Sequence, residues 1–116
     1  NGKRFNQLTD EVTKYMRQSL EPMAIAAARM AASYAATCAS VDIDRRGTTE
    51  YAYYAHQVGL AYGMMLQIEK VKTATPIYND ALGYLSYASA NGMSKEVGWM
   101  IDALRKQVPS SPKSRK

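Results

Sequence analysis

The stretch from residue 48 to residue 73, TTEYAYYAHQVGLAYGMMLQIEKVKT, constrains the fold more than any other part of the chain. Its apolar residues recur at helical spacing on more than one side, which predicts one helix of about seven turns at 3.6 residues per turn. Ala55, Gly59 and Gly63 lie four residues apart and form a strip without large side chains, where another backbone can approach closely. A helix that must bury several of its sides needs several neighbours, so we expect it at the centre of a helical bundle.

The composition of the chain also favours an all-α fold. Its 116 residues are enough for a single domain with a real hydrophobic core, and 47% of them are hydrophobic. Apart from tyrosine, residues that favour strands are sparse, whereas Ala, Met, Leu, Gln and Lys are common. We therefore predict an all-α bundle of about five helices.

Start and stop signals divide the chain into these helices. Pro22 predicts a break near residues 19–21 that separates a first pair of helices. Thr75 followed by Pro76 is typical of a helix start, and Asn91-Gly92 of a helix end. Thr9 and Ser94 are expected to cap the first and the last helix. The expected helices are 8–19, 22–39, 48–73, 76–90 and 94–108, and the residues expected in one core are Val58, Tyr62, Leu85, Ile101 and Leu104.

The same signals predict three regions along the chain. Residues 1–47 form a basic N-terminal arm followed by the Pro-broken helix pair, residues 48–108 the core of the bundle, and residues 109–116 a basic tail. The first two helices have a narrow apolar stripe and a smooth Ala-rich face, which is too little for a compact monomer. We therefore expect this apolar surface to be covered by self-association or by a related subunit.

The sequence contains little that could support catalysis. His56 is the only histidine and lies in the most apolar helix, where a packed or interfacial role is expected. Cys38, the only cysteine, excludes an internal disulfide framework and a Cys-based zinc site. Phosphate-binding glycine motifs are absent, and Asp42 and Asp44 lack the further ligands of a calcium loop. We expect a protein that is not an enzyme, with no catalytic residue, no metal and no cofactor.

A membrane-spanning helix is not expected either. The nearest candidate, residues 22–41, is Ala-rich and carries Arg29. Gly59 and Gly63 match the spacing of close-packed membrane helices, but polar residues in the same helix favour close packing within a bundle. The chain begins at Asn1 rather than at a methionine, which leaves open whether residues precede it, and the printed sequence contains no recognisable signal or transit segment.

The charge of the chain indicates a polyanionic partner. Fifteen basic residues against ten acidic ones give a net charge of +5, although ordinary solvated surface charge remains an alternative explanation. Many of the cations lie in the first two helices and their flanks, where they could neutralise phosphates of double-stranded DNA without reading its sequence. The candidate nucleic-acid-binding residues are Lys3, Arg4, Lys14, Arg17, Arg29, Arg45 and Arg46.

The chain resembles the coat proteins of filamentous and rod-shaped archaeal viruses. The resemblance is carried by the break at residues 20–22 and by the segment ALGYLSYASANGMSKEVGWMIDAL, residues 81–104. It covers most of the chain as a pattern, without a signature motif. It implies a virion protein whose N-terminal helices wrap DNA held in the A form while its bundles tile the filament exterior. Lys14, Arg17 and Arg29 would then face phosphates.

Residues 76–109 are also similar to one pentatricopeptide helical hairpin. Tyr78-Asn79, Asn91-Gly92 and a closing amphipathic helix carry this second resemblance. It implies a small scaffold subunit of a larger assembly, within the cell or in an organelle such as the mitochondrion, with no role in binding nucleic acid. Both resemblances predict a structural protein, but only the resemblance to coat proteins predicts that it binds DNA.

Overall fold

The described residues of this computed structural model, 2–41 and 49–109, are helical apart from turns and short connections, and none of them forms a strand. The all-α prediction is therefore confirmed. The helices are α1 (Gly2–Arg17), α2 (Glu21–Val41), α3 (Thr49–Ile68), α4 (Pro76–Ala88) and α5 (Ser94–Gln107), with a π-helical turn η2 (Ser89–Met93) between the last two.

The number of separate helices is smaller than the predicted five. Because η2 joins α4 to α5 without an intervening loop, the described chain has four uninterrupted helical runs. The predicted helix end at Asn91-Gly92 is present as a kink within the last run, which comprises α4, η2 and α5. Gly92 has a φ of 103°, in the left-handed region that favours glycine. Asn91 and Gly92 both have non-helical backbone angles, so the chain reverses direction at this kink between α4 and α5.

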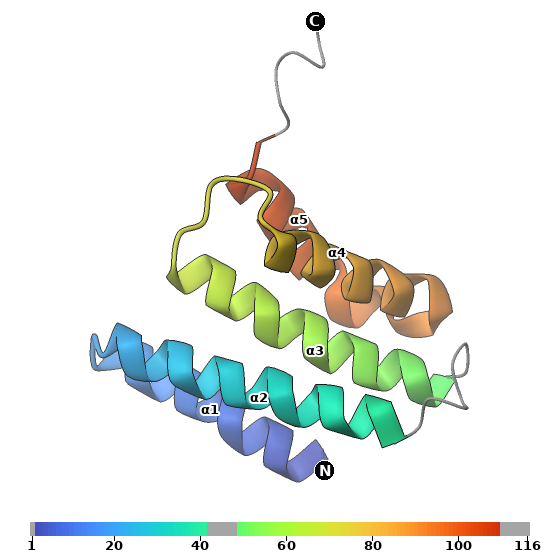
Figure 1. Cartoon of the computed structure of the whole chain (residues 1–116), viewed down its shortest axis with the longest axis horizontal. Coiled ribbons are helices and arrows are strands. Elements are labelled where there is room, and N and C mark those ends of the chain that lie inside the picture. The colour runs from blue at the N-terminus through green and yellow to red at the C-terminus, as the bar shows by residue number, and fades with distance from the viewer. Residues whose placement is uncertain (1, 42–48, 110–116) are drawn as a thin grey trace, which may run out of the picture.

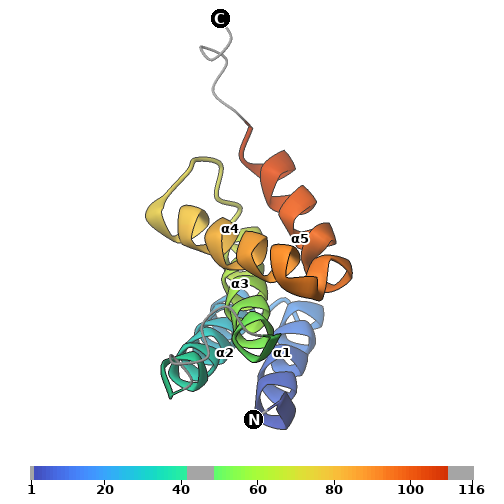
Figure 2. The same cartoon turned by 90° about the vertical axis from the view of Figure 1, so that its right-hand side faces the viewer.

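Helix α3 lies at the centre of the molecule, as its sequence predicts. Figures 1 and 2 show α1 and α2 packed below it and α4 and α5 above it. Its residues contribute to the packing on both sides, and Ala52, Ala55, Val58 and Ala61 are almost completely buried. The helix thus holds together two helical hairpins that are distant in the sequence.

The glycines of α3 allow this close packing. A Cβ atom added at Gly59 would lie 2.6 Å from Cγ of Leu85 and 3.2 Å from the backbone nitrogen of the same residue. A Cβ atom added at Gly63 would lie 2.6 Å from Sδ of Met100. The predicted strip of small residues is therefore confirmed as the surface on which α4 and α5 rest. On the other side of α3, the smooth face of α2 is buried through Ala24, Ala27, Ala28, Ala31, Ala32 and Ala35.

The buried side chains form three clusters rather than the single predicted core. Leu85, Ile101 and Leu104 belong to the cluster between α3, α4 and α5. Val58 belongs to a second cluster with α1 and α2, and a third lies further along the same three helices. Tyr62 is half-buried and packs against all three clusters. Helix α3 separates the first cluster from the other two, because it lies between the α4–α5 side and the α1–α2 side of the interior.

Two helices end in the same hydrogen-bonded turn. After α1, the Leu20 N–H donates to the Tyr15 carbonyl at 2.8 Å while Ser19 has a φ of 60°. After α3, the Val71 N–H donates to the Leu66 carbonyl at 3.1 Å while Lys70 has a φ of 55°. Both are Schellman turns in which a non-glycine residue takes the left-handed position. The predicted break before Pro22 is confirmed, since α2 begins at Glu21.

The predicted end of α3 at residue 73 is wrong, because the turn at Lys70 stops the helix at Ile68. The Gln107 side chain holds this turn in place. Its Nε2 donates to the carbonyls of Leu66 at 2.7 Å and Val71 at 2.8 Å. The end of α3 is thus fixed by a residue of α5, which no local sequence signal reveals.

The predicted start of the first helix is wrong, and so are the caps predicted at Thr9 and Ser94. Helix α1 begins at Gly2 rather than at residue 8, so residues 2–7 are helical and do not form an arm. Thr9 lies inside α1 and donates its hydroxyl to the Asn6 carbonyl. Helix α5 begins at Ser94, but its N-cap is Met93 and no side chain caps it. Thr75 does cap α4, because its Oγ1 accepts a hydrogen bond from the Tyr78 N–H at 3.2 Å.

We expect Gly59→Ala to lower the free energy of unfolding by about 1–3 kcal/mol, because the new methyl group would overlap with Leu85. The loss should appear even though alanine favours a helix over glycine by up to about 1 kcal/mol. Gly83→Ala in α4 is the matched control, since no atom lies within 4 Å of its Cβ position. It should raise the free energy of unfolding. Urea denaturation followed by circular dichroism measures both, and an equal gain in the two variants would contradict the close packing.

Candidate nucleic-acid interface

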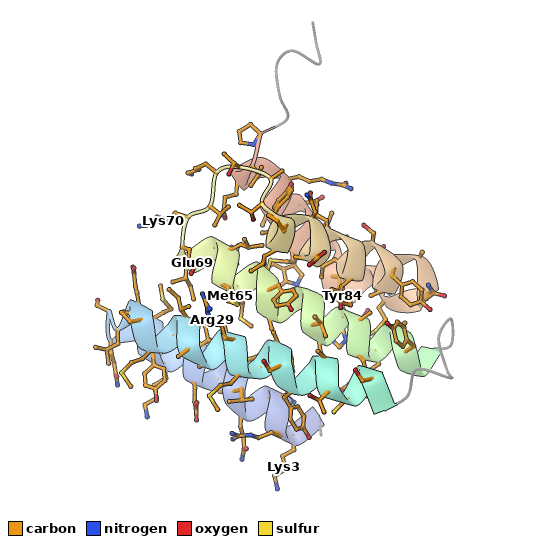
Figure 3. The ribbon with its side chains drawn as sticks, in the orientation of Figure 1. Lys3, Arg29, Met65, Glu69, Lys70 and Tyr84 are labelled. Carbon is orange, nitrogen blue, oxygen red and sulfur yellow. The ribbon has the colours of Figure 1, made fainter. Side chains whose placement is uncertain are left out.

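The outer face of α1 carries three of the predicted cations. Phe5, Leu8 and Val12 form its buried face. Lys3, Lys14 and Arg17 fall within roughly 60° of one another on the opposite side at 3.6 residues per turn, and all three are exposed. Figure 3 shows Lys3 projecting away from the helices.

We call Lys3, Lys14 and Arg17 the cation line. It spans about 21 Å of helix at 1.5 Å per residue. Asp10 lies between Lys3 and Lys14 on the same face and is also exposed. None of the three cations forms an ion pair with a carboxylate among the described residues. Lys14 lies over the ring of Tyr15, with its Nζ 5.8 Å from the ring centroid. The line is therefore open to an external anion.

Arg29 occupies a different surface. Its guanidinium forms an ion pair with Glu69 at the end of α3, with 3.6 Å between Nη2 and Oε2. The two side chains remain 62% and 35% exposed, so solvent screens the pair (Figure 3). Arg29 therefore has a partner within the chain, and an incoming phosphate would have to compete with Glu69.

Arg4 and Arg29 line one hollow between α1 and α2. It has a volume of about 330 Å³, and Leu8, Met30 and Tyr34 also contribute to its walls. Burial raises the pKa of the Tyr34 phenol, Cys38 adds to the rise, and Arg4 opposes it. Tyr34 is thus neutral at neutral pH, and the charge of the hollow comes from the two arginines. Arg4 also contacts the Gln7 side chain at 3.5 Å.

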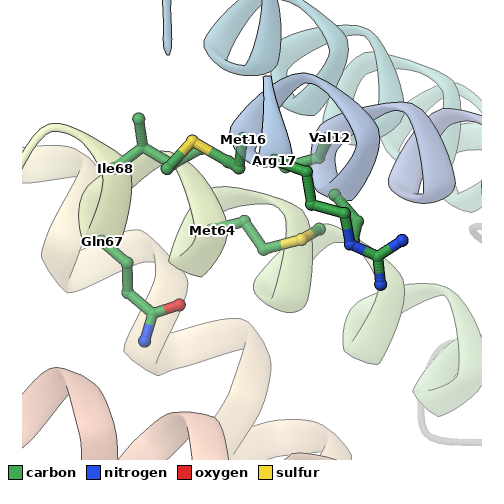
Figure 4. A pocket seen from close by; sticks show the side chains of 7 residues that line it. Val12, Met16, Arg17, Met64, Gln67 and Ile68 are labelled. Atoms are coloured by element: carbon green, nitrogen blue, oxygen red, sulfur yellow. The ribbon is translucent and has the colours of Figure 1, made fainter. Parts of the chain in front are cut away.

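A larger groove of about 460 Å³ lies between α1 and α3. Its apolar walls are Val12 and Met16 from α1 and Met64 and Ile68 from α3. Figure 4 shows the Arg17 side chain at one end of this row and Ile68 at the other. Thr13 and Gln67 complete the lining. The cation line therefore adjoins an apolar groove at Arg17.

The first two helices expose several large apolar side chains, whereas the Ala-rich face of α2, which the sequence analysis expected a partner to cover, is buried within the chain. Met16 and Leu20 are 38% and 39% exposed, and Met23 and Met30 reach 46% and 52%. All four belong to α1, α2 or the turn between them. The remaining large hydrophobic side chains that are exposed among the described residues are Tyr53, Ile77 and Trp99. The hairpin of α1 and α2 is thus the part of the described chain richest in exposed apolar groups.

Some predicted residues lie elsewhere, and one cation was missed. Arg45 and Arg46 lie outside the described residues, as do Asp42 and Asp44. Lys70, which follows Glu69 directly, is exposed at the end of α3 (Figure 3). The sequence prediction does not include Lys70, which follows the Arg29 partner Glu69 in the chain.

The side chains with catalytic potential, His56 and Cys38, are not arranged as a catalytic site. His56 is half-buried beside Tyr53, with 5.1 Å between the ring centroids, and its Nδ1 contacts the Tyr53 carbonyl. Cys38 is half-buried and is a free thiol that interacts with the Tyr34 hydroxyl. Over the residues that the structure describes, no three His, Cys, Asp or Glu side chains gather as a metal site requires. Within the same residues, no helix has the length and apolar character needed to span a membrane, in line with the prediction.

Comparisons with known proteins add no further site residues. No protein-family model, no curated protein and no solved structure matches the chain. The resemblances to coat proteins and to pentatricopeptide hairpins remain predictions from the sequence pattern.

We expect Arg29→Ala and Glu69→Ala each to change the free energy of unfolding by less than about 1 kcal/mol, because the pair is exposed. The double variant should show a coupling between the two residues of only a few tenths of a kcal/mol, and added salt should reduce it. Urea denaturation at low and high salt gives these values. A coupling of several kcal/mol would mean that Arg29 is held in the fold and is unavailable to a phosphate.

Proposed function

We propose that the chain is a structural, non-catalytic subunit that self-assembles and binds double-stranded DNA through its phosphates without reading the sequence. The observation that carries this proposal is the cation line on the outer face of α1. Lysine and arginine side chains there can replace the counterions of a duplex, which is the main source of affinity in binding of this kind.

The helical start of the chain strengthens the proposal. Lys3 belongs to α1 rather than to a separate arm, so its position relative to Lys14 and Arg17 is fixed by the helix. Three cations held on one rigid line lose less conformational freedom on meeting a phosphate backbone than three cations on a flexible arm. The buried Phe5 and Leu8 hold this line against the rest of the fold.

The exposed apolar side chains of α1 and α2 support self-assembly. A surface that gathers Met16, Leu20, Met23 and Met30 loses unfavourable contact with water when another subunit covers it. Together with the cation line, this surface fits a subunit that binds DNA and its own copies. A coat-like subunit of a filamentous virion is the form of assembly that we propose.

The alternative is a scaffold subunit of a protein assembly that binds no nucleic acid. The composition of the α1–α2 hairpin favours this alternative, since three carboxylates accompany its five cations. Asp10 in particular interrupts the cation line. An assembly held together by the apolar side chains alone needs no polyanion, so DNA binding decides between the two proposals.

We expect the Lys3→Ala, Lys14→Ala double variant to bind duplex DNA more weakly than the wild type at low salt. If each lysine meets a phosphate, the slope of log K against log salt should fall by roughly two units. These lysines suit the test better than Arg17, which lines a groove, or Arg29, which pairs with Glu69. Fluorescence anisotropy of labelled DNA duplexes of unrelated sequence at several salt concentrations provides the measurement.

The matched control is the Arg105→Ala, Lys106→Ala double variant. It removes the same charge from exposed positions in the last turn of α5, the end of that helix that points away from α1 (Figure 2). Its salt slope should stay close to that of the wild type. Absence of binding at low salt, or equal losses in both double variants, would reject the DNA-binding proposal in favour of the scaffold alternative.

Self-assembly should appear as a mass in solution above the 12.9 kDa of one chain. Covering the exposed apolar side chains is favourable, so the mass should rise with protein concentration, and duplex DNA should promote the rise by bringing subunits together. Multi-angle light scattering with and without DNA measures it. A monomer at high concentration under both conditions would contradict self-assembly.

A further inference from the structure

We propose that the groove between α1 and α3 receives the Trp99 side chain of a second copy of this chain. The inference rests on the proposed self-assembly and names the contact that carries it. The groove has a volume of about 460 Å³. That size lies within the range of roughly 300–1,000 Å³ that is typical of sites for compact organic groups.

Trp99 is suited to enter an apolar groove. It lies on α5 and is 57% exposed, more than any other large hydrophobic side chain among the described residues. Its Nε1–H already donates to the Glu96 carbonyl at 3.1 Å. Burial of the indole therefore leaves no donor unpaired, and the usual cost of burying a tryptophan N–H is avoided.

The groove is suited to receive an aromatic ring. Met16 and Met64 contribute flexible thioether side chains from its two sides, and such side chains adapt their shape to a ring and make favourable sulfur–aromatic contacts. Val12 and Ile68 supply the remaining apolar wall. Met16 is 38% exposed, so a ring placed against it would remove apolar surface from water on both partners.

Two carboxylates beside Trp99 can pair with cations beside the groove. Glu96 and Asp102 lie three residues before and after Trp99, one turn away on either side along α5, and both are exposed. Lys95 also lies one turn away and Lys106 two turns away on the same face, and the two carboxylates are the charges that the indole would carry toward the cations of the groove. At the groove, Arg17 contributes a cation to the lining, and the exposed Lys14 lies one turn earlier in α1. A copy that presents Trp99 thus brings carboxylates toward a basic rim.

The contact must form between copies. Within one chain the groove is lined by α1 and α3 alone, while Trp99 remains exposed on α5. Each chain therefore has one indole that can enter the groove of another copy and one groove that can receive the indole of another copy. Because the two surfaces are different, loss of either one leaves the other free to bind an intact partner.

Trp99 is the only tryptophan, so its fluorescence reports the contact directly. In the wild type, the emission maximum should shift to shorter wavelength as the protein concentration rises and the mass increases. Trp99→Ala and Met16→Glu should each raise the concentration of half-association at least tenfold. Ile77→Ala and Ile77→Glu are the matched controls at an exposed apolar position of α4, and they should associate as the wild type does. Circular dichroism confirms that each variant is folded.

Mixing the two defective variants gives the sharpest test. Trp99→Ala retains the groove and Met16→Glu retains the indole, so a mixture should form one-to-one complexes at a concentration at which each variant alone stays monomeric. The emission of the Met16→Glu chain should shift to shorter wavelength as the Trp99→Ala chain is added. A mixture that stays monomeric with unchanged emission would overturn the proposed contact.

The same measurements separate this contact from the proposed function. A wild type that stays monomeric with and without DNA would reject self-assembly itself, and the contact with it. A wild type that associates while Trp99→Ala associates equally well would reject the Trp99 contact alone. DNA binding by the Trp99→Ala monomer should persist, because the cation line lies on α1.

Discussion

The close approach of α4 and α5 to α3 is the constraint on which the rest of the structure depends. Gly59 and Gly63 leave room for Leu85 and Met100, so one helix can be covered on one side by the C-terminal hairpin and on the other by α1 and α2. Small residues at these positions shorten the distance between helices and let the larger side chains of the neighbouring helices pack closely. The alanines of α2 serve the same purpose on the opposite side.

The sequence predicts this architecture well where local chemistry decides it. The helical period of α3, the break before Pro22 and the cap at Thr75 each follow from residues within a few positions of one another. The prediction fails where distant residues decide. Gln107 holds the turn that ends α3 through bonds to Leu66 and Val71, and no pattern near residue 70 announces a partner so far along the chain.

In the candidate site, too, local residues could be predicted from the sequence and contacts between distant residues could not. Its cations were found from the sequence as residue types, but their grouping depends on the fold. Because α1 begins at Gly2, Lys3 shares a line with Lys14 and Arg17 that an arm would not provide. Arg29 does not belong to this line, because the packing of α2 places it beside Glu69, which is forty positions away in the sequence. Helical period could have revealed the line, had the start of α1 been placed correctly.

Arg17 links the two proposals physically, since it ends the cation line and also borders the groove between α1 and α3. A phosphate bound at Arg17 would weaken its attraction for the carboxylates beside an incoming Trp99, while a duplex that binds several subunits would raise their local concentration. The first effect opposes assembly and the second favours it. Exposed charge pairs contribute at most about 1 kcal/mol, whereas tethering can raise apparent affinity by roughly 10²–10⁴. Tethering should therefore dominate, and DNA and self-assembly should reinforce each other by the same coupling free energy in both directions.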